Sequence, residues 1–181
     1  MARAEAMRTI LLALLVIMPD ARLRPDSLTQ TSPCAMTNLV VATTLRPVID
    51  HMWHTSLTFK AQCARLSQAP ALVVRIGLGN QSQVGARGRV EFVRAEGAVV
   101  RAEIMVFHEL RTITEIVEVL AHELEHVIEQ LDGVQLIPDS THGVHRTASG
   151  AFETARALHV GQTVSGEVEA ARERARKAGP R

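Results

Sequence analysis

The sequence predicts a single α+β domain, because helical and strand-like patterns occupy separate stretches of the chain. Helical spacing dominates residues 45–66, strand-like runs follow over residues 71–107, and helical spacing returns from residue 112. The length of 181 residues suits one domain, and 46% apolar against 22% charged residues suits a packed core. We expect the domain to span residues 39–165, with a charged tail at residues 166–181.

The N-terminal residues resemble an export signal. Arg3 and Arg8 precede an apolar run from Ile10 to Met18, which is too short to span a bilayer. We therefore expect residues 1–20 to be a signal peptide or an N-terminal anchor, and residues 21–38 to be a flexible linker. The protein is then periplasmic or extracellular, and touches a membrane only if the segment is not cleaved. A buried N-terminal helix is the alternative.

Two helices are predicted at the start of the domain. One is centred on Val48–Trp53, and the other begins near Thr55 or Ser56, either of which could cap it. Cys63 falls on the apolar face of the second helix, so we expect it to be buried. A disulfide between Cys63 and Cys34 is the alternative for an exported protein.

Strand signals follow these helices. Ala71–Ile76 is a short apolar run that ends at Gly77, and it predicts a strand. Arg89–Arg94 and Val99–Phe107 both alternate in polarity, and the turn signal Glu96-Gly97 lies between them. We expect these two runs to form a hairpin in a small antiparallel or mixed sheet.

A long amphipathic helix is predicted from Thr112 to Leu131, with Asp132-Gly133 as its end. A further helix is predicted from Ser149 to Val160, with Gly161 as its stop. The apolar residues of the long helix form one stripe at helical spacing: Ile113, Ile116, Val117, Leu120, Leu124, Val127, Ile128 and Leu131.

The motif His-Glu-Leu-Glu-His at residues 122–126 lies within the long helix. His122 and His126 therefore project together and could share one metal ion, for which imidazole ligands favour Zn²⁺. At about 100° per residue, both histidines lie nearly opposite the apolar stripe, so we expect them to face solvent or a cleft. The alternative is a charged outer helix face, because the same side carries Glu115, Glu118, Glu125 and Glu129.

This arrangement resembles the zincin metallopeptidases, in which an edge strand precedes a His-Glu-x-x-His helix. Residues 121–130, together with Phe152–Thr154, are also similar to a group of small uncharacterised bacterial proteins. The resemblance covers about Leu45 to Gly161 and is specific at the metal helix. It implies a zincin-like fold for residues 39–165, with Val99–Phe107 as the edge strand beside the active-site helix and a second helix carrying a metal ligand. It also implies a peptide or protein substrate bound as an extended strand.

Subtypes of this family differ in the third metal ligand. The metzincin subtype needs Gly and His where this chain has Glu129 and Asp132, so it is excluded. The gluzincin subtype takes a Glu from a later helix, which implies Glu153. Two His and one Glu leave a fourth position for water, as catalytic zinc requires. The alternative is that Glu153 is only an acidic residue in the first turn of that helix, where the helix dipole stabilises it. The rival ligands are His142, His145 and His159.

Glu123 is the expected general base, because it sits beside the first histidine and could take a proton from the attacking water. The motif also fits the inverted pattern His-x-x-Glu-His, in which Glu125 is the base. On the helix wheel, the two glutamates flank the histidine pair symmetrically. Inverted-motif peptidases take their third ligand from much farther downstream than this sequence reaches, and this favours Glu123.

Hydrolysis also needs a hydrogen-bond donor for the oxyanion that forms on the substrate. Gluzincins often use Tyr or His, and this chain has no Tyr. The candidates lie in one loop between the metal helices, which is otherwise polar surface: His142, His145 and Arg146. The carboxylates that could hold the imidazoles in place are Glu118, Glu129 and Asp132.

We therefore expect a zinc-dependent peptidase with one Zn²⁺ ion. A non-catalytic, zinc-stabilised peptide-binding module is the first alternative, and a structural exported domain with an incidental histidine pair is the second. The formal net charge is +1 and no basic stripe with interleaved aromatic residues occurs, so nucleic acid is not an expected partner.

Overall fold

The structure is a computed structural model that describes residues 38–80, 86–107, 110, 112–135, 143–146 and 152–179. The expected signal or anchor at residues 1–20, and all of the expected linker except Asn38, lie outside these residues. Cys34 does as well, so the structure does not test its pairing with Cys63. Within the described residues, no helix combines the length and apolar character needed to cross a membrane.

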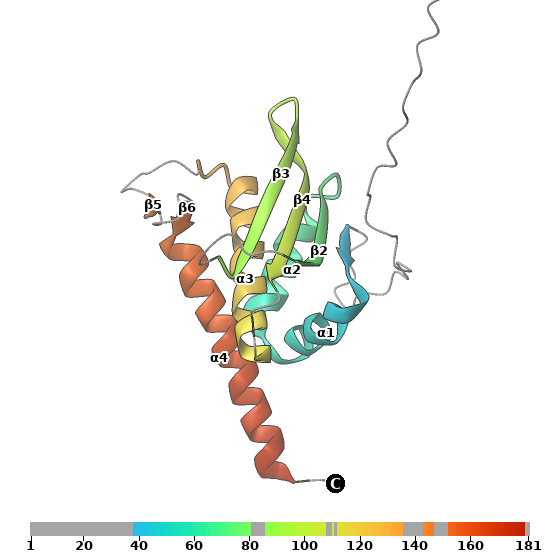
Figure 1. The fold of residues 1–181 in the computed structure, drawn as a ribbon, viewed down its shortest axis with the longest axis vertical. Helices are drawn as coiled ribbons and strands as arrows, with labels where there is room; N and C mark the ends of the chain where they lie inside the picture. The colour runs from blue at the N-terminus through green and yellow to red at the C-terminus, as the bar shows by residue number, and fades with distance from the viewer. Residues whose placement is uncertain are drawn as a thin grey trace, which may run out of the picture.

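In the described part of the chain, four strands form a mixed sheet in the order β1-β2-β4-β3 (Figure 1). Strands β1 (Leu39–Val41), β2 (Val73–Gly79) and β4 (Ala98–Phe107) run parallel to one another. Strand β3 (Gly88–Ala95) is antiparallel to β4, so the predicted hairpin is confirmed. The strand predicted from residue 71 begins two residues later, and the short β1 was not predicted.

The expectation that residues 99–107 form the edge strand is wrong. β4 pairs with β2 on one side and with β3 on the other, so β4 lies inside the sheet and β3 is the edge strand beside it. The reason lies in burial: Ala102, Ile104 and Val106 of β4 are all buried, whereas no residue of β3 is. An inner position suits a strand that contributes side chains to the core, and the more polar β3 tolerates the exposed edge.

The described residues contain four α-helices. The two predicted at the start of the domain are confirmed, and Ser56 caps the second by accepting a hydrogen bond from the backbone N of Phe59 at 2.9 Å. The long helix predicted from Thr112 to Leu131 is confirmed as well, and it begins with a capping box between Thr112 and Glu115. In chain order the helices are α1 (Arg46–Thr55), α2 (Leu57–Ser67), α3 (Ile113–Leu131) and α4 (Ala155–Ala178).

Helices cover one face of the sheet, and the hydrophobic core lies between these helices and the sheet. Val74 and Ile76 of β2 are buried, whereas Arg75 between them is exposed on the opposite face. The alternation in β4 is the same. Leu120 and Leu124 of α3 are fully buried in this core, as the apolar stripe predicts. Cys63 is buried there too, which confirms its predicted place in the core.

Helix α4 differs from the helix predicted at residues 149–160. It begins at Ala155 and runs through Gly161 to Ala178, so Gly161 is not a stop. It is instead the point where α4 approaches α3, because a Cβ at Gly161 would lie 2.8 Å from the carbonyl oxygen of Glu118. Figure 1 shows the two helices side by side. Most of the expected charged tail is therefore helical.

A second contact anchors α4 farther along. Glu167 accepts hydrogen bonds from the Ser56 hydroxyl and from the backbone N (3.1 Å) and hydroxyl (3.0 Å) of Thr58. Burial opposes ionisation of Glu167, but these hydrogen bonds outweigh it and lower its pKa. A carboxylate of α4 thus completes the N-terminus of α2, where negative charge is favourable.

Candidate metal centre

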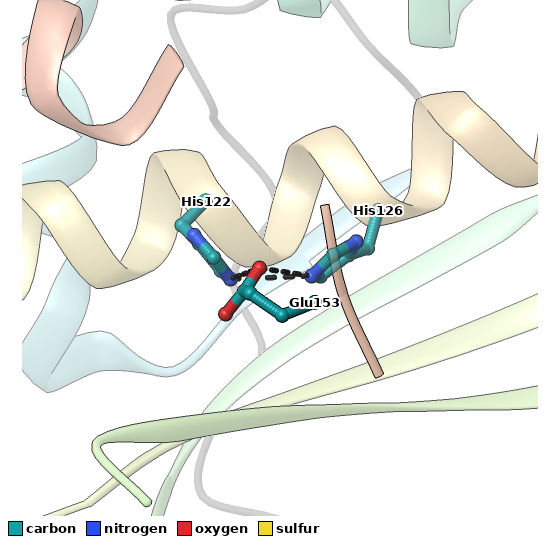
Figure 2. A group of neighbouring side chains, drawn as sticks. All are labelled: His122, His126 and Glu153. Atoms are coloured by element: carbon teal, nitrogen blue, oxygen red, sulfur yellow. Dashed lines mark hydrogen bonds and ion pairs between the residues drawn. The ribbon is translucent and has the colours of Figure 1, made fainter. Parts of the chain in front are cut away.

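Three side chains converge between α3 and the segment that leads into α4. His122 and His126 project from successive turns of α3, and Glu153 lies on β6 (Phe152–Thr154), a short strand paired with β5 (Val144–Arg146) (Figure 2). The expectation that Glu153 lies on a helix is therefore wrong. Its place on a strand that ends where α4 begins lets its side chain reach back across the gap to α3.

The ligand atoms of these residues lie close together. The Nε2 atoms of His122 and His126 are 3.1 Å apart, and Oε1 of Glu153 is 3.1 Å from the first and 3.4 Å from the second. These three residues form a group that could hold a metal ion. Of the rival third ligands, His145 and His159 are exposed and outside this group, and His142 lies outside the described residues.

The histidine face of α3, which we expect to meet solvent or a cleft, is enclosed by other elements rather than open to solvent. His126 is 4% exposed and His122 is half-buried. The helix wheel located the side opposite the core correctly, but α4 and β6 pack onto that side. Gly161 makes this approach possible, since a Cβ there would lie 3.1 Å from the Cβ of His122. α4 and β6 therefore enclose the site on the side of α3 opposite the core. The spacing of residues within α3 could not predict this second covering.

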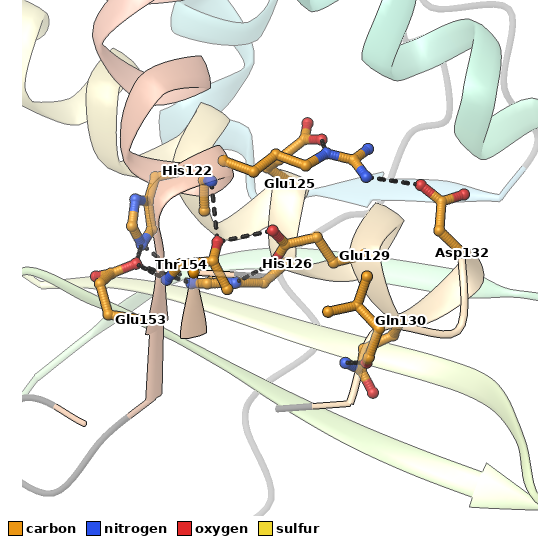
Figure 3. Close-up of polar contacts among 12 residues, drawn as sticks. His122, Glu125, His126, Glu129, Gln130, Asp132, Glu153 and Thr154 are labelled. Carbon is orange, nitrogen blue, oxygen red and sulfur yellow. Dashed lines mark hydrogen bonds and ion pairs between the residues drawn. The ribbon is translucent and has the colours of Figure 1, made fainter. Parts of the chain in front are cut away.

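One carboxylate holds His126 in place. Oε2 of Glu129 lies 2.8 Å from Nδ1 of His126, and the Thr154 hydroxyl donates to Oε1 of Glu129 at 2.7 Å (Figure 3). This contact leaves Nε2 of His126 facing the other two ligand atoms, which is the orientation that metal-binding histidines need. The other two candidates pair elsewhere, Glu118 with Arg87 and Asp132 with arginines of α2 and α4.

The structure distinguishes the two glutamates of the motif, which the helix wheel left equivalent. Glu125 accepts hydrogen bonds from Gln62 at 2.8 Å and from Arg156 at 2.6 Å, so α2 and α4 hold its carboxylate. Among the described residues, no donor reaches the carboxylate of Glu123. Its side chain lies against β3, because a Cβ at Gly88 would be 2.9 Å from Oε1 of Glu123.

Burial and neighbouring charges shift the protonation of the site. Burial raises the pKa of Glu123. The charges of both histidines lower it, but by less than burial raises it. For His126, burial favours the neutral ring, but hydrogen bonds with Glu129 and Glu153 outweigh it and raise the pKa to about 9. Burial likewise opposes ionisation of Glu153, but hydrogen bonds with the two histidines lower its pKa below the usual range.

The charge balance of the site fits a divalent cation. Among the described residues, no Lys or Arg forms an ion pair with Glu123, Glu129 or Glu153, although all three are at least partly buried. Buried carboxylates without a cation are costly. The raised pKa of His126 favours a positively charged ring among these carboxylates, and a divalent cation would supply positive charge at the same place.

The candidate oxyanion donors differ in position. His145 lies directly across the β5–β6 pair from Glu153, and Arg146 lies across from Phe152, with its guanidinium 5.4 Å from the ring centre. Paired residues share a face of a sheet and neighbours alternate, so His145 is on the side of Glu153 and Arg146 is on the other. His142 lies outside the described residues.

Sequence reasoning missed several residues of the site. Thr154 and Arg156 contact it from the start of α4, and Gln62 does so from α2. Gly161 was interpreted as a helix stop. The only available signal was the Thr at the start of a helical pattern, which is typical of a cap.

No family model, curated protein or solved structure matches this chain.

Proposed function

We propose that this protein is a zincin-like, zinc-dependent peptidase in which His122, His126 and Glu153 hold the ion and Glu123 is the general base. One observation carries the proposal: a carboxylate oxygen from β6 lies 3.1 Å and 3.4 Å from the two Nε2 atoms of α3. Two His and one Glu form a set that leaves one position of a four-coordinate zinc ion open, which is typical of catalytic sites.

The spacing of the ligand atoms supports zinc in particular. Ligand atoms about 2.0–2.1 Å from a tetrahedral ion are about 3.3 Å from one another. The three separations in this site are 3.1, 3.1 and 3.4 Å. Calcium needs six or more oxygen ligands, and magnesium strongly prefers oxygen. A site with two imidazoles suits neither of those ions.

The residues around the ion have complementary roles. When bound, zinc would lower the pKa of a water molecule and polarise the carbonyl of the substrate. Glu123 would take the proton of the attacking water and pass it to the leaving amine. Its burial raises its pKa above the usual carboxyl range, which favours such transfer. Glu125 is a weaker candidate, because Gln62 and Arg156 already occupy its carboxylate.

The edge strand β3 supports the choice of an extended peptide as substrate. Its outer edge carries no partner strand in the described part of the chain, and Gly88 near its start lies against Glu123. A peptide that pairs with this edge would pass beside the general base. His145 is the favoured oxyanion donor of the three candidates, because it shares a face of the β5–β6 pair with Glu153.

We also propose that the protein acts after export.

The test compares two glutamate variants that differ only in position. Purified wild type should contain about one zinc per chain and cleave members of a mixed peptide library, detected by mass spectrometry. Glu123→Gln should keep its zinc and lose at least about 100-fold in activity, the usual scale for removing a general base. Glu125→Gln is the matched control and should retain most of the activity.

Each negative result would refute a different part of the proposal. Less than a tenth of an equivalent of zinc in wild type would refute the metal site. A zinc-loaded wild type that cleaves no peptide would refute the peptidase and favour a non-catalytic zinc-stabilised module. Equal activities of wild type and Glu123→Gln would refute the role of Glu123. A selective loss in Glu125→Gln would assign the base to Glu125 instead.

A further inference from the structure

Thr154 contacts both sides of the candidate metal centre. Its backbone N donates to Oε1 of Glu153 at 2.9 Å, and this is the oxygen that faces both histidines. Its hydroxyl donates to Oε1 of Glu129 at 2.7 Å, and Oε2 of Glu129 holds Nδ1 of His126. One fully buried residue is therefore linked to two of the three ligands through separate atoms.

The same hydroxyl also begins α4. It accepts a hydrogen bond from the backbone N of Ala157 at 3.0 Å, which makes Thr154 the N-cap of the helix. The hydroxyl has one proton to donate, and the helix uses only its lone pairs, so the proton is available to Glu129. The start of α4 and the orientation of His126 thus depend on one oxygen atom.

We propose that Thr154 is a positioning residue that couples the start of α4 to the geometry of the metal centre. This inference rests on the metal site of the proposed function and adds a residue to it. Glu129 is 1% exposed, and the described residues offer its carboxylate only His126 and Thr154 as partners. Without the hydroxyl, no donor among the described residues reaches Oε1 of Glu129, and the carboxylate can turn away from His126.

The helix cap and the positioning role predict different results, and the chain offers a matched control. Thr112 caps α3 in the same way, by accepting from the backbone N of Glu115 at 3.1 Å, but it lies more than two turns before His122. Thr112→Val and Thr154→Val each remove one threonine cap without changing side-chain volume much. Only the second removes a contact to the metal centre.

The experiment measures zinc affinity by competition with a chromophoric chelator, and the geometry of the site by the visible spectrum of the Co²⁺-substituted protein. We expect Thr154→Val to bind zinc about 10-fold or more weakly, as is usual when a group that supports a metal ligand is lost, and to have an altered Co²⁺ spectrum. Thr154→Ser, which keeps the hydroxyl, should bind within about twofold of wild type. Thr112→Val should keep both the wild-type affinity and the wild-type spectrum.

Unchanged zinc affinity and an unchanged Co²⁺ spectrum in Thr154→Val would overturn the proposal, as would an equal loss in Thr112→Val. If Thr154→Val does not fold, Glu129→Gln tests the same path, and wild-type affinity in that variant would overturn it. Because the readout is metal affinity, the result does not depend on peptide cleavage. A wild type that binds no zinc would refute this inference and the proposed function together.

Discussion

At the scale of single residues, Glu123 and Glu125 differ in their partners rather than in their position on α3. Both are buried, yet Glu125 is held between Gln62 and Arg156, and Glu123 contacts the edge strand instead. A carboxylate fixed in this way is a poor proton carrier, because hydrogen bonds from an amide and a guanidinium already engage its oxygens. Burial raises the pKa of Glu123, and no donor among the described residues holds its carboxylate, so it remains available for proton transfer.

The ion pair of Glu125 should be structural, and a double-mutant cycle can measure it. Arg156→Met leaves a buried carboxylate whose remaining donor among the described residues is Gln62, so we expect a loss of about 2 kcal/mol in the free energy of unfolding. This is below the usual 3–5 kcal/mol for a fully buried pair, because the Arg156 side chain is 44% exposed. Urea unfolding gives the value.

The double variant Glu125→Gln/Arg156→Met should be more stable than the sum of the two single losses predicts, by about 1 kcal/mol. Simple additivity of the two single losses would contradict a direct coupling between these side chains. The cycle needs no assumption about activity, so it tests the site's scaffold on its own.

At the scale of elements, the metal centre depends on how closely α4 lies against α3. Gly161 is the contact point, and a Cβ there would lie 2.8 Å from a backbone oxygen of α3 and 3.1 Å from His122. Backbone cannot yield as a flexible side chain can, so any larger residue must push α4 outward. Glu153 lies two residues before the first residue of α4 and would move with the helix.

Gly161→Ala should therefore destabilise the protein by about 1–2 kcal/mol and weaken zinc binding, although alanine is the better helix former by about 1 kcal/mol. The matched control is Gly166→Ala, on the same helix and exposed, where a Cβ would meet nothing within 4 Å. That variant should gain about 0.5–1 kcal/mol from helix propensity alone. Thermal unfolding and chelator competition measure both effects. A stabilised Gly161→Ala variant would contradict the close contact.

The elements differ in how far the sequence predicts them. α3 is recognisable because its apolar stripe and its capping residues agree, and the β3–β4 hairpin is recognisable because both strands alternate around a turn signal. The start of α4 is not, since Glu153 and Thr154 carry no periodic pattern and pair only with β5, a contact set by the tertiary fold. The three candidate ligands could be named from the sequence, whereas their burial beneath α4 could not.

At the scale of the whole molecule, α4 connects the metal centre to the rest of the fold. Its first residues contact the site, its middle packs along α3, and Glu167 completes the N-terminus of α2. The two histidines, by contrast, belong to the sheet-covering helix α3. An ion shared by His122, His126 and Glu153 would therefore fasten α4 to the core.

Removing the metal should lower the stability of the whole domain. With free zinc at about 100 times its Kd, binding stabilises the folded state by about 2.7 kcal/mol, which for a chain of this size corresponds to a Tm difference of about 5–10 °C. Calorimetry with and without a chelator measures it. His122→Gln should have a Tm that does not respond to zinc. The exposed His159→Gln should respond as wild type does, and a lost response there would move the ligand set to His159.

The order of the ligands along the chain has a consequence for biosynthesis. The ribosome releases α3 with both histidines first, and the β5–β6 pair with Glu153 and then α4 follow only on the order of seconds later. Of the three candidate ligands, a nascent chain at that stage therefore carries only the two imidazoles of α3. The third candidate ligand arrives with the segment that also covers the site, so a partly synthesised chain would lack the complete group of ligands.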